Sequence, residues 1–317
     1  MRVLVTGGTG YLGAAIVRAL ERRGHDPVVF ARHATAARLP GRAIDGDVAD
    51  RAAVIAAARG CDAMCHTAAL VTLWRPDASE FDRVNVGGVE HAIAAARDAG
   101  LGRLVYTSSF LARPPAGQST PLAANDYQRT KVLGEAVARR GQAAGLPMVI
   151  VYPGVVYGPG ALTEGNLLGR LLADHLAGRL PGLIGADRTW SYAWVDDVAD
   201  AHVAALEHRS PAASYELGGE NVPQMRPFEI ARELAGCRLP RRVPYWLASA
   251  IGRLELARAR LTGRMPQLTP GTVEIFRHDW PVACADAQRD LGFKVLPLEQ
   301  GVSATLDALR TGDRRST

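Results

Sequence analysis

Tyr127 and Lys131 have the residue types and the spacing of an acid–base pair. The stretch from 127 to about 140 is predicted to be a helix, where residues four apart share one face, with Cβ atoms about 6 Å apart. A phenol with a pKa of about 10 is a poor acid or base at pH 7, and a nearby ammonium is expected to lower that pKa. Only two of the 37 basic residues are lysines, Lys131 and Lys294. A compact ammonium at 131 therefore indicates a role that an arginine would fill less well.

Two serines, Ser108 and Ser109, end the predicted strand that begins at Arg103. A hydroxyl there would hydrogen-bond a substrate carbonyl or alcohol oxygen while the tyrosine moves a proton. Because side chains alternate along a strand, only one serine faces the same side as the tyrosine, and we favour Ser109. The alternative is that each serine only caps a helix or a turn.

The chain begins with the pattern of an anion site. Val3–Val5 is predicted to be a buried strand, and it runs into a turn with Gly7, Gly10 and Gly13 before the helical stretch Ala14–Leu20. A strand, a glycine turn and a helix N-terminus together present free backbone N–H groups and a positive dipole end. No Gly-Lys-Ser/Thr follows, which excludes a P-loop. The pattern therefore indicates a dinucleotide site.

The residues that follow the second predicted strand, Pro27–Phe30, indicate whether the dinucleotide is NAD(H) or NADP(H). An acidic residue at this point would bond the ribose 2′-OH of NAD(H), whereas an arginine accommodates the 2′-phosphate of NADP(H). The sequence has Arg32 and no acid there. We therefore expect NADP(H) rather than NAD(H), the alternative being that Arg32 is an ordinary surface arginine.

Alternating strands and helices up to about residue 155 predict an α/β fold with a doubly wound parallel sheet of the Rossmann type. We expect residues 1–155 to form the NAD(P)-binding domain and 156–317 a smaller, irregular substrate lobe, of which 186–208 packs back on the sheet. Asp47 is expected either to cap the next helix or to bond an adenine amino group. His66 is expected to be a core histidine. The amphipathic stretch 245–261 is a candidate for packing on a partner helix.

Bulk properties narrow the class of protein. The chain has 317 residues and a formal net charge of +5, with basic residues scattered rather than clustered, so no nucleic-acid partner is expected. The four cysteines fit neither a disulfide framework nor a zinc site, and no metal is expected. No signal peptide or membrane-spanning stretch is evident, which predicts a cytoplasmic protein.

Eight motifs spread over nearly the whole chain make it resemble the extended short-chain dehydrogenases/reductases, the NAD-dependent epimerase/dehydratase superfamily. The motifs are Thr6–Gly13, Gly46–Val48, His66–Ala69, Asn85–Gly88, Val105–Ser109, Tyr127–Lys131, Tyr152–Pro159 and Val195–Ala199.

The resemblance implies roles for particular residues. Ser109, Tyr127 and Lys131 would be the catalytic set, with Asn85 positioning a water or the lysine, and Asp196 and Asp197 would be structural. Cofactor contacts are implied for the pyrophosphate turn (Gly7, Thr9, Gly10, Tyr11, Leu12, Gly13), the adenine (Asp47, Val48), the ribose path (Ala68, Ala69, Lys131) and the nicotinamide (Tyr152, Pro153, Val156).

Within that superfamily, Trp74 and the segments Leu217–Asn221 and Pro244–Leu247 resemble the dihydroflavonol reductase-like and 3β-hydroxysteroid dehydrogenase-like branch. The chain departs from plant flavonoid reductases in the short span between Ser109 and Tyr127. It also has Gly154 beside the expected nicotinamide, where the missing side chain would add room.

We therefore expect an NADP(H)-dependent ketone reductase or alcohol dehydrogenase acting on a hydrophobic, even polycyclic, small molecule, as a homodimer paired through the helix of Tyr127. Apolar residues of the second lobe favour such a substrate: Leu167, Leu168, Leu171, Leu172, Trp190, Tyr192 and Trp194. One alternative is an NAD-dependent nucleotide-sugar epimerase or dehydratase, with Arg170, Arg179 and Arg188 in its nucleotide pocket. Another is a cofactor-sensing or scaffold protein without catalysis.

Overall fold

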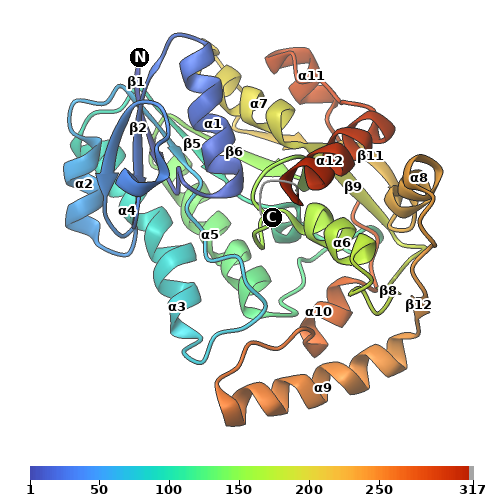
Figure 1. The fold of residues 1–317 in the computed structure, drawn as a ribbon. Coiled ribbons are helices and arrows are strands. Elements are labelled where there is room, and N and C mark those ends of the chain that lie inside the picture. The colour runs from blue at the N-terminus through green and yellow to red at the C-terminus, as the bar shows by residue number, and fades with distance from the viewer. Residues whose placement is uncertain (314–317) are drawn as a thin grey trace.

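A seven-stranded parallel sheet forms the larger part of the protein, seen here in a computed structural model that describes residues 1–313 (Figure 1). Its strand order, β10-β6-β5-β4-β1-β2-β3, reverses direction beside β1, as in a doubly wound dinucleotide-binding fold. The strands are β1 (Arg2–Thr6), β2 (Asp26–Ala31), β3 (Arg42–Asp45), β4 (Ala63–His66), β5 (Arg103–Thr107), β6 (Met148–Pro153) and β10 (Ser214–Leu217). The predicted fold class is confirmed.

Helices cover both faces of this sheet, which explains why its strands are short, nearly continuous apolar runs. One face packs on α1 (Tyr11–Arg22), α7 (Val195–Glu207) and α11 (Ala285–Leu291). The other packs on α2 (Arg51–Ala58), α4 (Gly88–Asp98) and α5 (Asp126–Ala143). Four short helical turns lie in the connections: η1 (Thr35–Ala37), α3 (Ser79–Phe81), the π-helical η2 (Asp82–Gly87) and η3 (Phe110–Ala112).

Residues after 155 divide between the sheet and a second lobe. Helix α7 and strand β10 return to the sheet, where α7 packs against α1 and β10 pairs with β6. The division of the chain at residue 155 stays a prediction, and residues 195–217 lie largely with the sheet.

The second lobe has a core of its own, built around the three-stranded sheet β11-β9-β7. These strands are β7 (Val155–Tyr157), β9 (Thr189–Trp194) and β11 (Glu220–Pro223), and a two-stranded sheet joins β8 (Leu183–Ile184) to β12 (Arg242–Val243). The lobe's helices are α6 (Leu167–Leu176), α8 (Arg226–Ala235), α9 (Tyr245–Thr262), α10 (Pro270–Ile275) and α12 (Leu298–Asp313). None of the helices within residues 1–313 is long and apolar enough to cross a lipid bilayer.

The start of α2 corrects one sequence expectation, because Asp50 and not Asp47 caps this helix. The Asp50 carboxylate accepts hydrogen bonds from the N–H groups of Ala52 and Ala53. Asp47 lies three residues earlier and accepts one hydrogen bond from the N–H of Ala49, at 2.9 Å. A side chain reaches the free N–H groups of a helix from the residue directly before its first turn, and Asp50 occupies that position.

The structure also gives a different reason for the glycine at position 154 from the one expected. A Cβ atom at this position would lie 2.7 Å from the carbonyl oxygen of Ser191 in β9. The missing side chain therefore lets β9 approach the end of β6, rather than adding room for a nicotinamide.

We expect Gly154→Ala to lower the free energy of unfolding by about 1–3 kcal/mol, because β9 must shift to admit a methyl group. Urea denaturation measures the change. Gly102→Ala is the matched control, since its nearest neighbour would be the Asp62 oxygen at 3.6 Å, and it should change stability by no more than about 0.5 kcal/mol. Equal effects of the two substitutions would refute the packing role of Gly154.

Candidate functional site

The turn between β1 and α1 is held so tightly that side chains cannot enter it. Gly7 has a φ of +70°, and a Cβ atom there would lie 2.7 Å from the Cα of Ala68. A Cβ atom on Gly13 would lie 2.2 Å from the carbonyl oxygen of Gly7. Gly7 thus makes the turn possible against β4, and Gly13 lets the first turn of α1 pack on it.

Free donors remain at the mouth of this turn. Gly10 is the N-cap of α1, and no side chain caps the helix there. The N–H groups of the first helical turn have no partner inside the helix, and Thr9 and Gly10 are exposed. Tyr11 and Leu12 begin the helix and are partly buried. This cradle of exposed N–H groups at a positive dipole end fits the pyrophosphate of a dinucleotide.

Arg32 lies directly after β2, exposed and without an ion-pair partner among the described residues. The acidic residue nearest in the sheet register is Asp45, opposite Ala31. Its carboxylate is already engaged by the N–H and hydroxyl of Thr35, at 2.9 and 2.7 Å, and these hydrogen bonds lower its pKa. The end of β2 therefore presents a guanidinium and no free carboxylate.

The other residues predicted near the adenosine are near this edge of the sheet. Ala68 touches the Gly7 turn, and Ala69 follows it in the same partly exposed loop. Asp47 is exposed, and Val48 is buried with its carbonyl oxygen 2.8 Å from Nδ1 of His91.

Tyr127, Lys131 and Ser109 come together where β5 ends and α5 begins. The Lys131 Nζ donates a hydrogen bond to the carbonyl oxygen of Thr107 at 3.1 Å and lies 5.9 Å from the centre of the Tyr127 ring. Ser109 lies near enough to the phenol of Tyr127 to lower its pKa, and its oxygen accepts the N–H of Leu111 at 3.2 Å. Ser109 therefore faces the tyrosine and caps η3 as well.

The pKa values at this site follow burial more than charge. Burial raises the pKa of Tyr127 to about 12, against a lowering by the hydrogen bond with Ser109. Burial also lowers the pKa of Lys131 to about 8. The expected lowering of the Tyr127 pKa by Lys131 is wrong for this structure, because the ammonium group points to the Thr107 carbonyl rather than the phenol. At pH 7 Tyr127 holds its proton and Lys131 is mostly charged.

Asn85 is buried but touches neither Tyr127 nor Lys131 through its hydrogen bonds. Its side-chain oxygen accepts the N–H of Leu70 at 2.7 Å, and its amide nitrogen donates to the Leu70 carbonyl and to the Thr130 hydroxyl. Asn85 thus joins the loop after β4 to helix α5.

The side chain of Tyr152 is engaged by two arginines. Its hydroxyl accepts a hydrogen bond from Arg139 on α5 at 2.8 Å, and the Arg113 guanidinium lies 5.1 Å from its ring centre. Only its backbone is free for a cofactor, whereas Pro153 ends β6 and Val156 is partly exposed in β7.

Two histidines support the site from inside the protein. His202 of α7 lies 2.9 Å from the Thr107 hydroxyl and 2.7 Å from the Val198 carbonyl, and burial lowers its pKa to about 4. It steadies the residue whose carbonyl holds Lys131, and sequence reasoning missed it because 95 residues separate the two partners. His66 is a buried core histidine, as predicted, with Nδ1 2.8 Å from the Thr6 hydroxyl.

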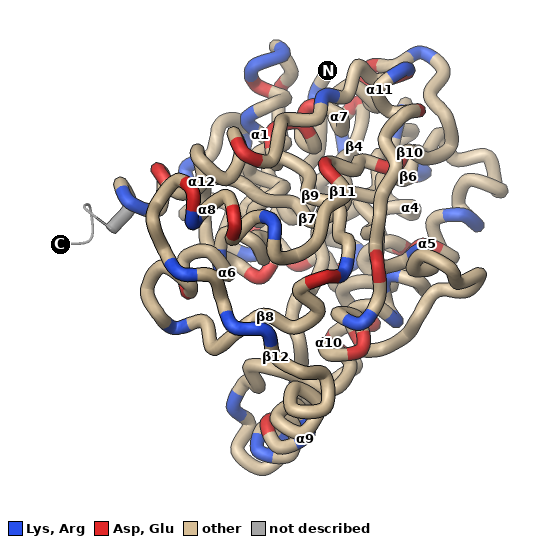
Figure 2. The backbone as a smooth tube through the Cα atoms, turned by 90° about the vertical axis from the view of Figure 1, so that its right-hand side faces the viewer, with Lys and Arg blue, Asp and Glu red and all other residues tan. Residues whose placement is uncertain are grey.

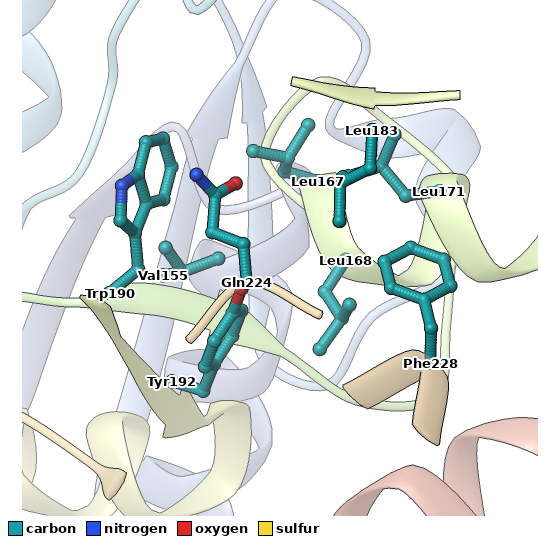
Figure 3. A pocket seen from close by; sticks show the side chains of 9 residues that line it. All are labelled: Val155, Leu167, Leu168, Leu171, Leu183, Trp190, Tyr192, Gln224 and Phe228. Atoms are coloured by element: carbon teal, nitrogen blue, oxygen red, sulfur yellow. The ribbon is translucent and has the colours of Figure 1, made fainter. Parts of the chain in front are cut away.

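An apolar pocket lies in the second lobe, next to β7 (Figure 3). Its one polar side chain is Gln224, and its cavity of about 10 Å³ is no larger than the space that one water needs. The remaining lining residues are Val155, Leu167, Leu168, Leu171, Leu183, Trp190, Tyr192 and Phe228. Of the apolar residues singled out from sequence, Leu172 is instead in the lobe's core and Trp194 packs on Tyr157.

Charged residues considered earlier are occupied by structural contacts. Arg170, Arg179 and Arg188 pair with Glu164, Asp174 and Asp279 respectively. At the start of α7 the carboxylate of Asp197 accepts the N–H of Leu296 at 3.0 Å, in keeping with a structural role.

The amino-acid sequence of this chain is similar to those of known proteins. A family model described as "NAD dependent epimerase/dehydratase family" matches residues 3–218. Sterol demethylase protein B of Methylococcus capsulatus is 30% identical over 308 residues, covering 92% of this chain and 93% of that protein. The 2-alkyl-3-oxoalkanoate reductase of Stenotrophomonas maltophilia is also 30% identical, covering 95% of this chain and 97% of that protein.

Solved structures share the fold over nearly the full length. The crystal structure of gox2253 superposes with a TM-score of 0.81 at 27% identity, covering 98% of each chain. MoeE5, solved with UDP-glucuronic acid and NAD, gives a TM-score of 0.76 at 23% identity, covering 98% of this chain and all of that one.

We expect Lys131→Met to raise the free energy of unfolding by about 1–3 kcal/mol at pH 7, because a buried ammonium with a lowered pKa costs stability. A lysine whose pKa is lower in the folded state is penalised where it is charged. The gain should therefore be full below about pH 8 and vanish as the pH approaches that of free lysine, about 10.5. Urea denaturation at several pH values measures it.

The control is Lys294→Met, which changes the chain's other lysine at an exposed position and should alter stability by less than about 0.5 kcal/mol. A gain that does not depend on pH, or a loss of stability on replacing Lys131, would contradict the burial cost.

Proposed function

This chain belongs to the NAD dependent epimerase/dehydratase family, and from that premise we propose that it is an NADP(H)-dependent reductase of a ketone on a hydrophobic, even polycyclic, small molecule. The reverse oxidation of the alcohol would use the same groups. The observation that carries the proposal is the meeting of Ser109, Tyr127 and Lys131 between the glycine turn and an apolar lobe.

The protein's own groups supply the proton and the orientation. When bound, the nicotinamide cofactor supplies hydride to the carbonyl carbon or accepts it from the alcohol. Tyr127, which is protonated at neutral pH, donates its proton to the carbonyl oxygen as that oxygen becomes a hydroxyl. Ser109 would hydrogen-bond the same oxygen. Lys131 joins α5 to the end of β5 through the Thr107 carbonyl, which helps to position Tyr127. The ammonium group of Lys131 would also donate hydrogen bonds to the ribose hydroxyls of a bound cofactor.

The lining of the second lobe supports an apolar substrate. The apolar pocket beside β7 contains one amide and no charged side chain. The pocket is too small for a substrate as it stands, so Leu167 and Leu171 on the partly exposed face of α6 must move to admit one. The names of two relatives, which refer to a sterol and to a 2-alkyl-3-oxoalkanoate, point to the same class of molecule.

The same observations weigh against a nucleotide-sugar epimerase. A nucleotide diphosphate needs free cationic groups, and the three arginines considered for that role all pair with carboxylates. The likeness to MoeE5 lies below 25% identity and concerns the fold alone.

We also propose that the protein is a cytoplasmic homodimer that pairs through α4 and α5. The support is the exposed Leu133 on α5 and the reduced state of the cysteines at the described positions. Light scattering tests the oligomeric state.

Tyr127→Phe should lower kcat for ketone reduction at least about a hundredfold, because the proton donor is lost. Affinity for NADPH should stay within about twofold, since the ring remains. Tyr106→Phe is the control, because its buried hydroxyl has no partner among the described residues and the ring beside Lys131 is kept. Steady-state kinetics with a ketone confirmed as a substrate measure kcat of both variants. Full activity of Tyr127→Phe would rule out Tyr127 as the proton donor.

Arg32→Ala should weaken NADPH binding at least about tenfold, or 1.4 kcal/mol, and leave NADH binding unchanged. Fluorescence titration of both cofactors measures the preference, with the exposed Arg59→Ala as control. Tighter binding of NADH by the unaltered protein, or NAD⁺ that co-purifies and resists dialysis, would favour the epimerase instead.

A further inference from the structure

Helix α9 projects from the second lobe and is held to it along one narrow face (Figure 1). Its buried residues are the small Ala248, Gly252 and Ala259. A Cβ atom on Gly252 would lie 3.0 Å from the backbone of Thr269, so the helix packs closely on the segment that leads into α10. The small residues of α9 thus face the protein, which reverses the usual arrangement of a surface helix.

The large apolar side chains of α9 face away from the protein. Leu261 is 88% exposed, Trp246 73% and Leu254 71%, and Leu247 and Ile251 are exposed as well. A contiguous exposed apolar face of this kind marks an interaction surface rather than a solvated one.

Charge is concentrated on the same segment. Residues 241–264 contain six arginines and one glutamate, a formal charge of +5, which equals the formal charge of the entire chain. The glutamate, Glu255, is engaged by Arg258 at 2.7 Å and by the N–H of Gln267. Arg253, Arg260 and Arg264 are exposed and have no ion-pair partner among the described residues. Figure 2 shows basic positions along the projecting helix.

We propose that α9 docks this protein on the surface of a bilayer that contains anionic phospholipids. An apolar helix face flanked by arginines lies in the interface plane, with its leucines and tryptophan at the boundary of headgroups and acyl chains and its cations on lipid phosphates. Charge complementarity selects this occupant, because a second copy of the chain docked on this face would bring two segments 241–264, each of formal charge +5, together.

The docked helix would also bring the rim of the site close to the bilayer. Met265, just after α9, packs on Thr72 in the loop that follows β4. Gly271 of α10 lies against Ala124, which precedes the catalytic helix α5. Hydrophobic compounds dissolve in bilayers, so this geometry suits their delivery, but docking itself does not depend on which molecule is the substrate.

Co-sedimentation with large unilamellar vesicles tests the proposal. We expect the protein to bind vesicles of phosphatidylcholine and phosphatidylglycerol, mixed about three to one, at least about tenfold more strongly than pure phosphatidylcholine at about 0.1 M salt. The double variant Leu254→Glu/Leu261→Glu should lose this binding. Arg253→Gln and Arg260→Gln should each weaken it about fivefold. Leu234→Glu, which changes an exposed leucine at the end of α8, is the matched control and should bind as the unaltered protein does.

Cofactor affinity and light scattering of the same variants separate the outcomes. Retained NADPH affinity of the Leu254→Glu/Leu261→Glu protein would show that lost vesicle binding is not a folding defect. Equal binding to both kinds of vesicle, no effect of the α9 variants, or a dimer that this double variant converts to monomer without any vesicle binding would overturn the proposal. The last result would identify the helix as an interface between copies.

Discussion

The hydrogen bond from the Lys131 ammonium to the Thr107 carbonyl joins the two elements on which the site depends, the end of β5 and the first turns of α5. The hydroxyl of Thr107 is in turn held by His202 from the opposite face of the sheet. Asn85 ties the same helix, at Thr130, to the loop after β4. One buried cation is therefore positioned by elements from both sides of the sheet, which explains how its desolvation cost is tolerated in a stable fold.

Burial also decides the acid–base character of the site. The ammonium lies near the Tyr127 ring but does not hydrogen-bond its hydroxyl, so the phenol keeps a high pKa. Tyr127 is therefore protonated at neutral pH, which is the form that a proton donor requires. Ser109 is near the phenol and partly opposes the effect of burial on its pKa.

The two lobes present different kinds of chemical groups. The sheet edge offers free N–H groups and an unpaired arginine, which suit a phosphate-bearing cofactor. The second lobe offers leucines and aromatic rings, while Arg170, Arg179 and Arg188 in this lobe pair with carboxylates. Residues 241–264, which include the projecting helix α9, carry a formal charge of +5, equal to the formal net charge of the whole chain.

The sequence by itself determined the Rossmann-type sheet, the glycine turn and the Tyr127–Lys131 pair, because each depends on spacing within one strand, turn or helix. Only the tertiary structure decided the direction of side chains at places where distant segments meet. In the folded protein the Tyr152 hydroxyl bonds Arg139, β9 packs against Gly154, and His202 bonds the Thr107 hydroxyl. The pKa of Tyr127 was likewise beyond local reasoning, because spacing reports how near a charge lies but not how deeply a group is buried.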